Sequence, residues 1–282
     1  MTVSPPSLAE RLGYGQDARL LIVNCDDLGS SASANRATEQ ALAEGLATSS
    51  TLMVPCPWAL DGVRRAKAGG VGVHLTLTCE YPDYRWRSLT GAACLHDAEG
   101  YMPATAQAVW DRADLHAVRA ECRAQIDQAY DWGVDVTHLD AHMGAMQLEP
   151  RYADLFLELA AAYDLPVRMI GASAERRLGL SARARAGELG LVFPDKLVTT
   201  WAKPAKPTFE AILEDLPPGV TEVYLHPVED GPELRAYDPH AAQIRIDDRA
   251  CLLDPAFKAR IAELGIVLID FAPLRDLQRA RG

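Results

Sequence analysis

The chain has 282 residues, which suits one large α/β domain, and 49% of them are apolar, enough for a sizeable core. Its formal net charge of −11 argues against nucleic acid or an anionic membrane as the main partner, because both attract basic surfaces. No apolar run approaches the roughly 20 residues of a membrane span, and residues 1–6 lack the basic and apolar segments of a signal peptide. We therefore expect a cytoplasmic protein with no membrane partner. Its six cysteines include no C-x-x-C pair and are expected to be reduced.

The first half of the chain alternates between apolar runs and helix-like segments. Buried strands are predicted by the apolar runs at residues 20–27, 48–54, 71–77 and 134–142. Helices are predicted, from capping residues and the helical spacing of apolar side chains, at residues 34–44, 58–68 and 115–132. A long irregular segment, residues 78 to about 105, lies between the third strand and the last of these helices. A loop of this length in a compact domain is usually functional or mobile, and we expect it to lie over the site.

The second half continues the alternation. Helices are predicted at residues 150–163, 176–188, 209–213 and 254–264, and strands at 166–170, 197–200, 220–227 and 266–270. Alternating strands and helices indicate parallel β-α units, and the chain length with about seven strands favours an α/β fold of the irregular TIM-like (β/α) barrel class. Neither a G-x-G-x-x-G motif nor a Walker lysine is present, so nothing indicates a nucleotide site. We expect a single domain over residues 1–282.

Polar residues stand at the ends of the predicted strands. They are Asp26 and Asp27 at the end of the first strand, His74 at that of the third, Asp140 and His142 at that of the fourth, and His226 at that of a late strand. In a β/α barrel these ends lie on one face, where barrel active sites are built. Residues far apart in the sequence are therefore expected to meet there.

One carboxylate with two imidazoles can hold a metal ion and leave positions open for water and substrate. Asp27, His74 and His142 are the candidate ligands; a cluster of paired charges without a metal is the alternative. Asp140 and His142 are two residues apart and so share a strand face, which lets Asp140 orient a ligand or a second group. His138 shares that face but lies deeper in the barrel.

The aromatic residues of the long loop allow two interpretations. Tyr81, Tyr84 and Trp86 could form a sugar-binding wall over the site, or simply pack the loop onto the barrel. The remaining histidines are expected to be ordinary loop or helix residues: His96, His116 and His240.

Six fragments in chain order resemble the YdjC-like carbohydrate deacetylase family, and together they cover nearly the whole chain. They are LIVNCDDLG (residues 21–29) followed by Asn35, GLATSSTLMV (45–54), GVHLTLT (72–78), THLDAH (137–142), LHP (225–227), and LDP (253–255) with LGI (264–266). The resemblance implies an irregular TIM-like barrel, often dimeric, that removes acetyl groups from N-acetylated sugars. It also implies site residues by position: metal ligands Asp27, His74 and His142, a catalytic base Asp26, and a catalytic acid His226.

Two departures from the family pattern concern the substrate side of the site. Family members usually read D-S-H-x-H here, whereas this chain has Ala141 in place of the serine and Gly144 in place of the second histidine. The ligands are kept, so we expect the same chemistry beside a different substrate surface.

The sequence therefore leads to one principal hypothesis, metal-dependent hydrolysis of the N-acetyl group of a small amino sugar or oligosaccharide. One divalent ion is expected, with zinc ranked first on ligand chemistry and magnesium, nickel, cobalt or manganese as alternatives. Rival hypotheses are another metal-dependent amidase or phosphoesterase, and a non-catalytic barrel that binds a sugar or a partner protein.

Overall fold

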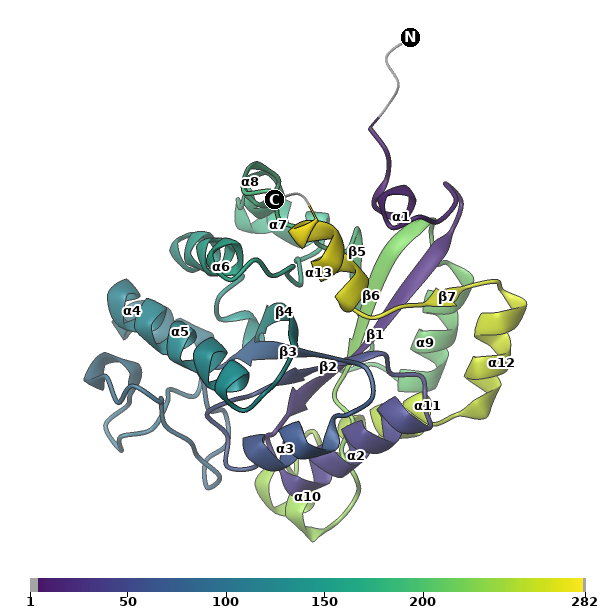
Figure 1. The fold of residues 1–282 in the computed structure, drawn as a ribbon. Helices are drawn as coiled ribbons and strands as arrows, with labels where there is room; N and C mark the ends of the chain where they lie inside the picture. The colour runs from purple at the N-terminus through teal and green to yellow at the C-terminus, as the bar shows by residue number, and fades with distance from the viewer. Residues whose placement is uncertain (1–4, 281–282) are drawn as a thin grey trace.

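The structure, a computed structural model, describes residues 5–280 and has a central sheet with helices around its outside (Figure 1). In these residues seven parallel strands form one sheet in the order β4-β3-β2-β1-β6-β5, and β7 pairs with the first half of β1. The strands are β1 (Arg19–Leu28), β2 (Ser49–Leu52), β3 (Gly70–Leu75), β4 (Val136–Ala141), β5 (Lys196–Thr199), β6 (Gly219–Leu225) and β7 (Val267–Leu268). The α/β architecture predicted from the sequence is confirmed. Residues 1–4, part of the segment predicted not to be a signal peptide, lie outside the described residues.

The sheet is open, so the irregular TIM-like barrel expected from the sequence is confirmed only in part, as a half-barrel. Its edges are β4 and β5, and the segment between them, predicted as a strand at residues 166–170, makes only an isolated bridge between Leu139 and Val167. The Val167 N–H donates to Val192 O instead of continuing a ladder. The fold is therefore a parallel half-barrel. Its remaining side is bridged by side chains and by single backbone hydrogen bonds, such as Leu139 N–H to Pro166 O and Arg168 N–H to Leu139 O, and not by a continuous ladder.

Helices flank the sheet on its outer side, and most follow a strand as predicted. They are α1 (Leu8–Arg11), α2 (Ala32–Ala43), α3 (Ala59–Arg65), α4 (Ala106–Arg112), α5 (Leu115–Asp131), α6 (Pro150–Ala162), α7 (Ala172–Leu178), α8 (Ala182–Glu188), α9 (Ala205–Glu214), α10 (Pro232–Tyr237), α11 (Ala242–Leu252), α12 (Pro255–Glu263) and α13 (Ala272–Arg279), with 3₁₀ turns η1 (Ala93–Leu95) and η2 (His142–Gly144). The apolar residues predicted at helical spacing in α5 are buried at Val118, Cys122, Ile126 and Ala129 and partly buried at Leu115. Asp114 accepts hydrogen bonds from the first turn of α5, as expected of an N-cap.

Two differences from the predicted elements matter for the site. The helix predicted at residues 176–188 is two helices, because Gly179 adopts a left-handed conformation that ends α7. Helices α10 and α11 lie in a segment where no element was predicted, and they border the site described below. All six cysteines are free, as predicted. Among residues 5–280 we find no helix that combines the length and the apolar character needed to cross a membrane.

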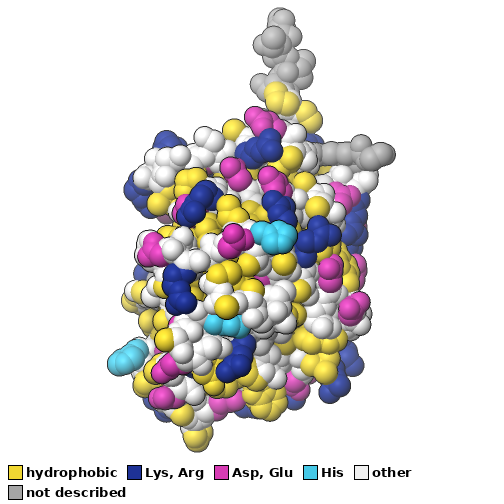
Figure 2. All heavy atoms as spheres, turned by 90° about the vertical axis from the view of Figure 1, so that its left-hand side faces the viewer, with side chains coloured by type: hydrophobic (Ala, Val, Ile, Leu, Met, Phe, Trp, Pro, Cys, Tyr) yellow, Lys and Arg dark blue, Asp and Glu magenta, His cyan; other side chains and the backbone are white. Residues whose placement is uncertain are grey.

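The molecular surface carries mixed charge. On the face shown in Figure 2, basic and acidic side chains are interspersed with hydrophobic ones. Such a face differs from the continuous basic surface that attracts nucleic acid, in keeping with the acidic composition.

Candidate metal centre and active site

Asp26 and Asp27 both face the same cavity although they are adjacent in β1. Successive side chains of a regular strand point to opposite faces. The pairing of β1 with β2 shifts register between Cys25 and Leu28, and Asp27 has a φ of 64°, in the left-handed region. Such a bulge redirects a side chain at a cost of about 1–3 kcal/mol, which the surrounding structure must offset. The local strain explains how one strand end supplies two carboxylates to one site.

Gly29 completes this strand end. It has a φ of 91°, and a Cβ there would lie 2.9 Å from the Cα of Ala59 at the start of α3. Its N–H donates to Oδ1 of the buried Asn35 at 2.7 Å. The glycine after the aspartate pair is therefore required both by backbone conformation and by the close approach of α3.

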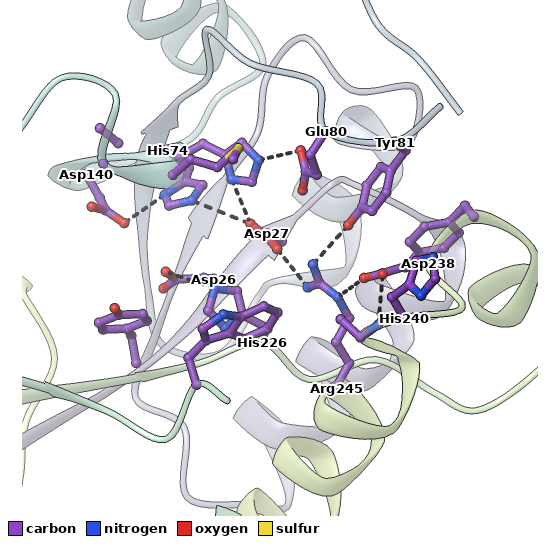
Figure 3. A pocket seen from close by; sticks show the side chains of 18 of the residues that line it. Asp26, Asp27, His74, Glu80, Tyr81, Asp140, His226, Asp238, His240 and Arg245 are labelled. Atoms are coloured by element: carbon purple, nitrogen blue, oxygen red, sulfur yellow. Dashed lines mark hydrogen bonds and ion pairs between the residues drawn. The ribbon is translucent and has the colours of Figure 1, made fainter. Parts of the chain in front are cut away.

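The three predicted metal ligands meet around one oxygen of Asp27 (Figure 3). Oδ1 of Asp27 lies 3.5 Å from Nε2 of His74 and 3.3 Å from Nδ1 of His142. One ligand atom from each residue lies within 4.8 Å of the others, and all three side chains are buried. The residues come from β1, β3 and the turn after β4, as predicted from their positions at strand ends.

A second carboxylate holds the far nitrogen of each histidine. Nδ1 of His74 lies 2.7 Å from Oδ2 of Asp140, its register partner on β4, and Nε2 of His142 lies 3.0 Å from Oε2 of Glu80. Glu80 hydrogen-bonds its histidine and Asp140 forms an ion pair with the other, and each leaves the ring nitrogen that faces Asp27 available as a ligand. Carboxylate–histidine pairs of this kind orient the ligands of protein metal sites. Asp140 thus contacts a ligand histidine, one of the two alternatives that the sequence left open.

The donor set fits a divalent cation. Oδ1 of Asp27 is buried without a hydrogen-bond partner, which is costly unless a cation compensates it. Burial alone would lower the pKa values of the histidines, but Asp140 raises that of His74 to about 9, and Glu80 with Asp27 raises that of His142 to about 10. Without metal the two rings therefore hold protons that a cation would displace.

A second cluster of possible ligands does not fit a cation. Asp26, His74 and Asp140 are also close together. However, Arg168 lies between the two carboxylates, with Nη1 at 2.7 Å from Oδ2 of Asp26 and 2.5 Å from Oδ2 of Asp140. The guanidinium already occupies the position that a second metal would need.

Arg168 also sets the state of Asp26. Burial alone would raise the pKa of Asp26, but the guanidinium of Arg168, which bonds both of its oxygens, holds this pKa at about 2. Nε of Arg168 donates to Oε1 of the buried Glu222 at 2.7 Å. Burial raises the pKa of Glu222 to about 7 against the opposing effect of Arg168. Asp26 is therefore ionised, and its carboxylate is bonded to Arg168. Glu222 is bonded to the same guanidinium through Nε.

His226 lies across the cavity from the metal ligands. Its Nε2 is 3.7 Å from Oδ2 of Asp26, and its ring packs against Trp201 with centroids 4.5 Å apart. Burial lowers the pKa of His226 in spite of the nearby carboxylates Asp27 and Asp26. The imidazole of His226 is therefore neutral at neutral pH, and it lies beside Asp26, the candidate base.

Arg245 of α11 joins the metal ligands to the cavity wall. Nη1 donates to Oδ2 of Asp27 at 2.9 Å, Nη2 to Oη of Tyr81 at 2.9 Å, and Nε to Oδ2 of Asp238 at 2.8 Å (Figure 3). Its guanidinium carbon lies 5.3 Å from the centre of the Trp201 ring. Each of the three guanidinium nitrogens of this buried side chain donates a hydrogen bond, so the side chain is fixed in place.

The cavity above these residues has a volume of about 700 Å³ and two unlike sides. One side carries polar and aromatic residues from the loop after β3 and the segment after α10: Glu80, Tyr81, Asp83, Tyr237, Asp238 and His240. The other side comes from β5 and the region between β4 and β5 and is mostly apolar, with Met143, Gly144, Leu148, Ile170 and Leu197 beside the polar Gln147 and Arg168. A ligand that is polar on one side and apolar on the other, as a sugar with an acyl group is, would match both.

The aromatic loop residues separate in the structure. Tyr81 lines the cavity, whereas the buried Trp86 donates its Nε1–H to Thr78 O, and Tyr84 donates its hydroxyl to Ser30 O. Their rings pack on one another and on Tyr237. Tyr84 and Trp86 thus lie behind Tyr81 and pack the loop onto the rest of the fold, as in the second of the two interpretations given above.

Two further histidines lie apart from the ligands. His138 stacks on Phe271 with ring centroids 3.7 Å apart, and its Nδ1 bonds Oγ1 of Thr137, deeper in the fold than His142. His240, expected to be an ordinary loop residue, is an exposed residue at the rim of the cavity.

Sequence reasoning missed Glu80, Arg168, Glu222 and Arg245. Arg168 and Glu222 each interrupt an apolar run, and a charge inside a buried strand was an available signal, because such charges are almost always paired. Glu80 and Arg245 lie in a loop and on a helix rich in charges, where no pattern distinguishes them.

Comparisons with known proteins identify the family of this chain. The sequence profile of the YdjC-like protein family matches residues 20–263. A carbohydrate deacetylase of Geobacillus stearothermophilus is 30% identical over 257 residues, which are 90% of this chain and 97% of the relative. One from Thermoanaerobacter pseudethanolicus is 28% identical over 91% of this chain and 100% of its own length. One from Thermus thermophilus is 45% identical, but over only 56% of each chain.

Solved structures share the fold. A crystal structure of an Enterococcus faecalis V583 protein superimposes with a TM-score of 0.77 over 91% of this chain and 99% of that one, at 22% sequence identity. The match extends over both the half-barrel and its surrounding helices. With the profile match across most of its length and a relative of 30% identity aligned nearly end to end, the chain belongs to the YdjC-like protein family.

Proposed function

We propose that the protein is a metal-dependent carbohydrate deacetylase that hydrolyses the N-acetyl group of an amino sugar or oligosaccharide. The observation that carries this proposal is that the two adjacent carboxylates have different neighbours. Asp27 faces two histidines, and Asp26 faces Arg168 and His226. The relatives named carbohydrate deacetylase support the reaction class.

A divalent ion held by Asp27, His74 and His142 would polarise the amide carbonyl and lower the pKa of a water molecule. Two nitrogens and one carboxylate oxygen favour zinc, with nickel, cobalt or manganese next; magnesium prefers oxygen ligands. Glu80 and Asp140 would keep the histidines in the orientation that binds it.

Asp26 acts as the base and His226 as the acid, linked by a proton transfer. Asp26 accepts a proton as water attacks the carbonyl carbon. Because Arg168 holds the pKa of Asp26 at about 2, the protonated form is a strong acid, and His226 at 3.7 Å is the more basic neighbour. His226 accepts this proton and delivers it to the leaving amine as the C–N bond breaks. A neutral His226 at the start of the cycle is therefore suited to the role.

The cavity supports a sugar substrate. Its polar side presents Asp83, Asp238 and the exposed His240 to hydroxyl groups, and Tyr81 offers an aromatic edge. A phosphoesterase with two metals finds no room at the second cluster, which Arg168 occupies. A non-catalytic sugar-binding barrel would not require the aligned Asp26–His226 pair.

Acetate release from N-acetylglucosamine and its short oligomers tests the proposal. We expect activity in the zinc-loaded protein, loss on metal removal with recovery on zinc addition, and a drop of about 10³-fold or more in Asp26→Asn. Absence of acetate from every N-acetylated sugar tried, with metal bound, would refute the deacetylase assignment. Full activity in metal-free protein would refute the mechanism. A homodimer stays a prediction, which light scattering would test.

A further inference from the structure

The two oxygens of Asp27 have opposite surroundings. Oδ1 points between His74 and His142 and has no hydrogen-bond partner, whereas Oδ2 accepts a hydrogen bond from Nη1 of Arg245 at 2.9 Å. A free carboxylate can bind a metal through one oxygen or both. Here one oxygen is already bonded to a buried guanidinium.

Arg245 cannot easily release Asp27, because its other donors are also engaged. Tyr81 and Asp238 accept from Nη2 and Nε, and the Trp201 ring lies against the guanidinium. The planar fork of arginine suits this arrangement of three acceptors, and a lysine could reproduce the charge but not the fork.

From these contacts we propose that Arg245 is a positioning residue that restricts Asp27 to one metal-binding oxygen and lowers the affinity of the site for its cation. The inference rests on the metal site proposed above. Single-oxygen ligation by Asp27 leaves one more position for water or the substrate carbonyl. The positive charge of Arg245, one carboxylate away from the ion, repels it and draws electron density from Asp27.

This role differs from that of Glu80 and Asp140. Those carboxylates orient histidines and strengthen metal binding, whereas Arg245 opposes it. The same side chain contacts Tyr81 and Asp238 of the cavity wall, so the ligation of the metal and the shape of the polar side depend on one residue.

Zinc affinity, measured without substrate, tests the proposal. Metal-stripped protein is titrated with Zn²⁺ against a chromophoric chelator, for the wild type, Arg245→Gln and Arg245→Lys. We expect Arg245→Gln to bind Zn²⁺ about ten-fold more tightly, since a nearby positive charge is gone. Arg245→Lys, which keeps the charge, should stay within about three-fold of the wild type. A merely structural role would weaken binding in both variants.

Cobalt-substituted protein gives a second readout. The visible absorption of Co²⁺ weakens as its coordination number rises, so Arg245→Gln should absorb less strongly than the wild type if Asp27 gains a second bond to the metal. Arg275→Gln is the matched control, because this arginine is also buried but hydrogen-bonds Val136 O at the start of β4, far from His142. Its zinc affinity and cobalt spectrum should equal those of the wild type.

Equal or weaker zinc binding by Arg245→Gln would overturn the inference, as would a similar gain in Arg275→Gln. If Arg245→Gln does not fold, a ten-fold change in the affinity of Arg245→Lys, in either direction, contradicts the charge argument. Failure of the wild type to bind Zn²⁺ at all would instead refute the metal site itself. Acetate release plays no part in these measurements, so the deacetylase assignment is tested separately.

Discussion

Arg168 donates to both oxygens of Asp26, from Nη1 to Oδ2 and from Nη2 to Oδ1, each at 2.7 Å. This bidentate contact fixes the orientation of the carboxylate and keeps it ionised. It also makes Asp26 a weak base, which transfers any proton it gains to a more basic neighbour. In the proposed mechanism His226 is that neighbour, so the Arg168–Asp26 pair would determine the direction in which the proton moves.

Substitution of Arg168 should therefore change the pH dependence of the reaction. In Arg168→Lys the charge remains but the fork is lost, so the pKa of Asp26 rises from about 2. We expect the acid limb of the kcat/KM profile to move to higher pH and kcat to fall about 10²-fold, with little change in KM. Kinetics over acidic to neutral pH would show this. An acid limb at the wild-type position would show that Arg168 does not act through Asp26.

Glu80 should strengthen metal binding. Glu80→Gln removes the carboxylate that accepts the Nε2–H of His142, and the loss of such a partner typically costs about ten-fold or more in affinity. Chelator competition with Zn²⁺ measures the effect. Glu99→Gln, in the same loop, is the control, because Glu99 is 73% exposed and pairs with Arg85. Equal affinities in the two variants would contradict the proposed function of Glu80.

Glu222 should make folding stability depend on pH. Its pKa is raised to about 7 in the folded protein, so its contribution is fully present below the unfolded value of about 4.3 and is lost as pH rises through about 7. We expect Glu222→Gln to gain up to about 3 kcal/mol relative to the wild type between about pH 5 and about pH 8. Urea unfolding at both pH values tests this, with the surface variant Glu214→Gln as control. A difference between Glu222→Gln and the wild type that stays constant with pH would refute it.

Gly144 should not tolerate a side chain. Its φ is 65°, and a Cβ would lie 2.7 Å from Cδ1 of Leu148 on the apolar side of the cavity. Gly144→Ala is expected to lose about 1–2 kcal/mol of unfolding free energy. Gly187→Ala, in α8 with open space around it, should gain up to about 1 kcal/mol instead. Equal effects of the two substitutions in denaturant unfolding would exclude the conformational explanation.

Much of the site was predictable because it depends on strand ends. Parallel strands place their carboxyl ends on one face, so Asp27, His74 and His142 could be assigned to one site from their positions in apolar runs. The bulge that directs both Asp26 and Asp27 into the cavity could not be predicted, because no local sequence pattern indicates a register shift between two strands.

The unpredicted part consists of long-range contacts. Closure of the sheet depends on whether the edges β4 and β5 find partners, and residues 166–170 have the apolar composition of a strand although they form none. Arg245 reaches Asp27 over 218 positions from a helix without a distinctive sequence. Such contacts are set by the packed fold and not by the segments that contribute to them.

Arg168 also links strands across the gap between β4 and β5. From within that gap it joins Asp26 of β1, Asp140 of β4 and Glu222 of β6. Its three ion pairs thus connect parts of the sheet that a closed barrel would link through backbone ladders. Asp26, the proposed base, therefore has its orientation only when these strands are in place, so assembly of the fold also assembles the proposed site.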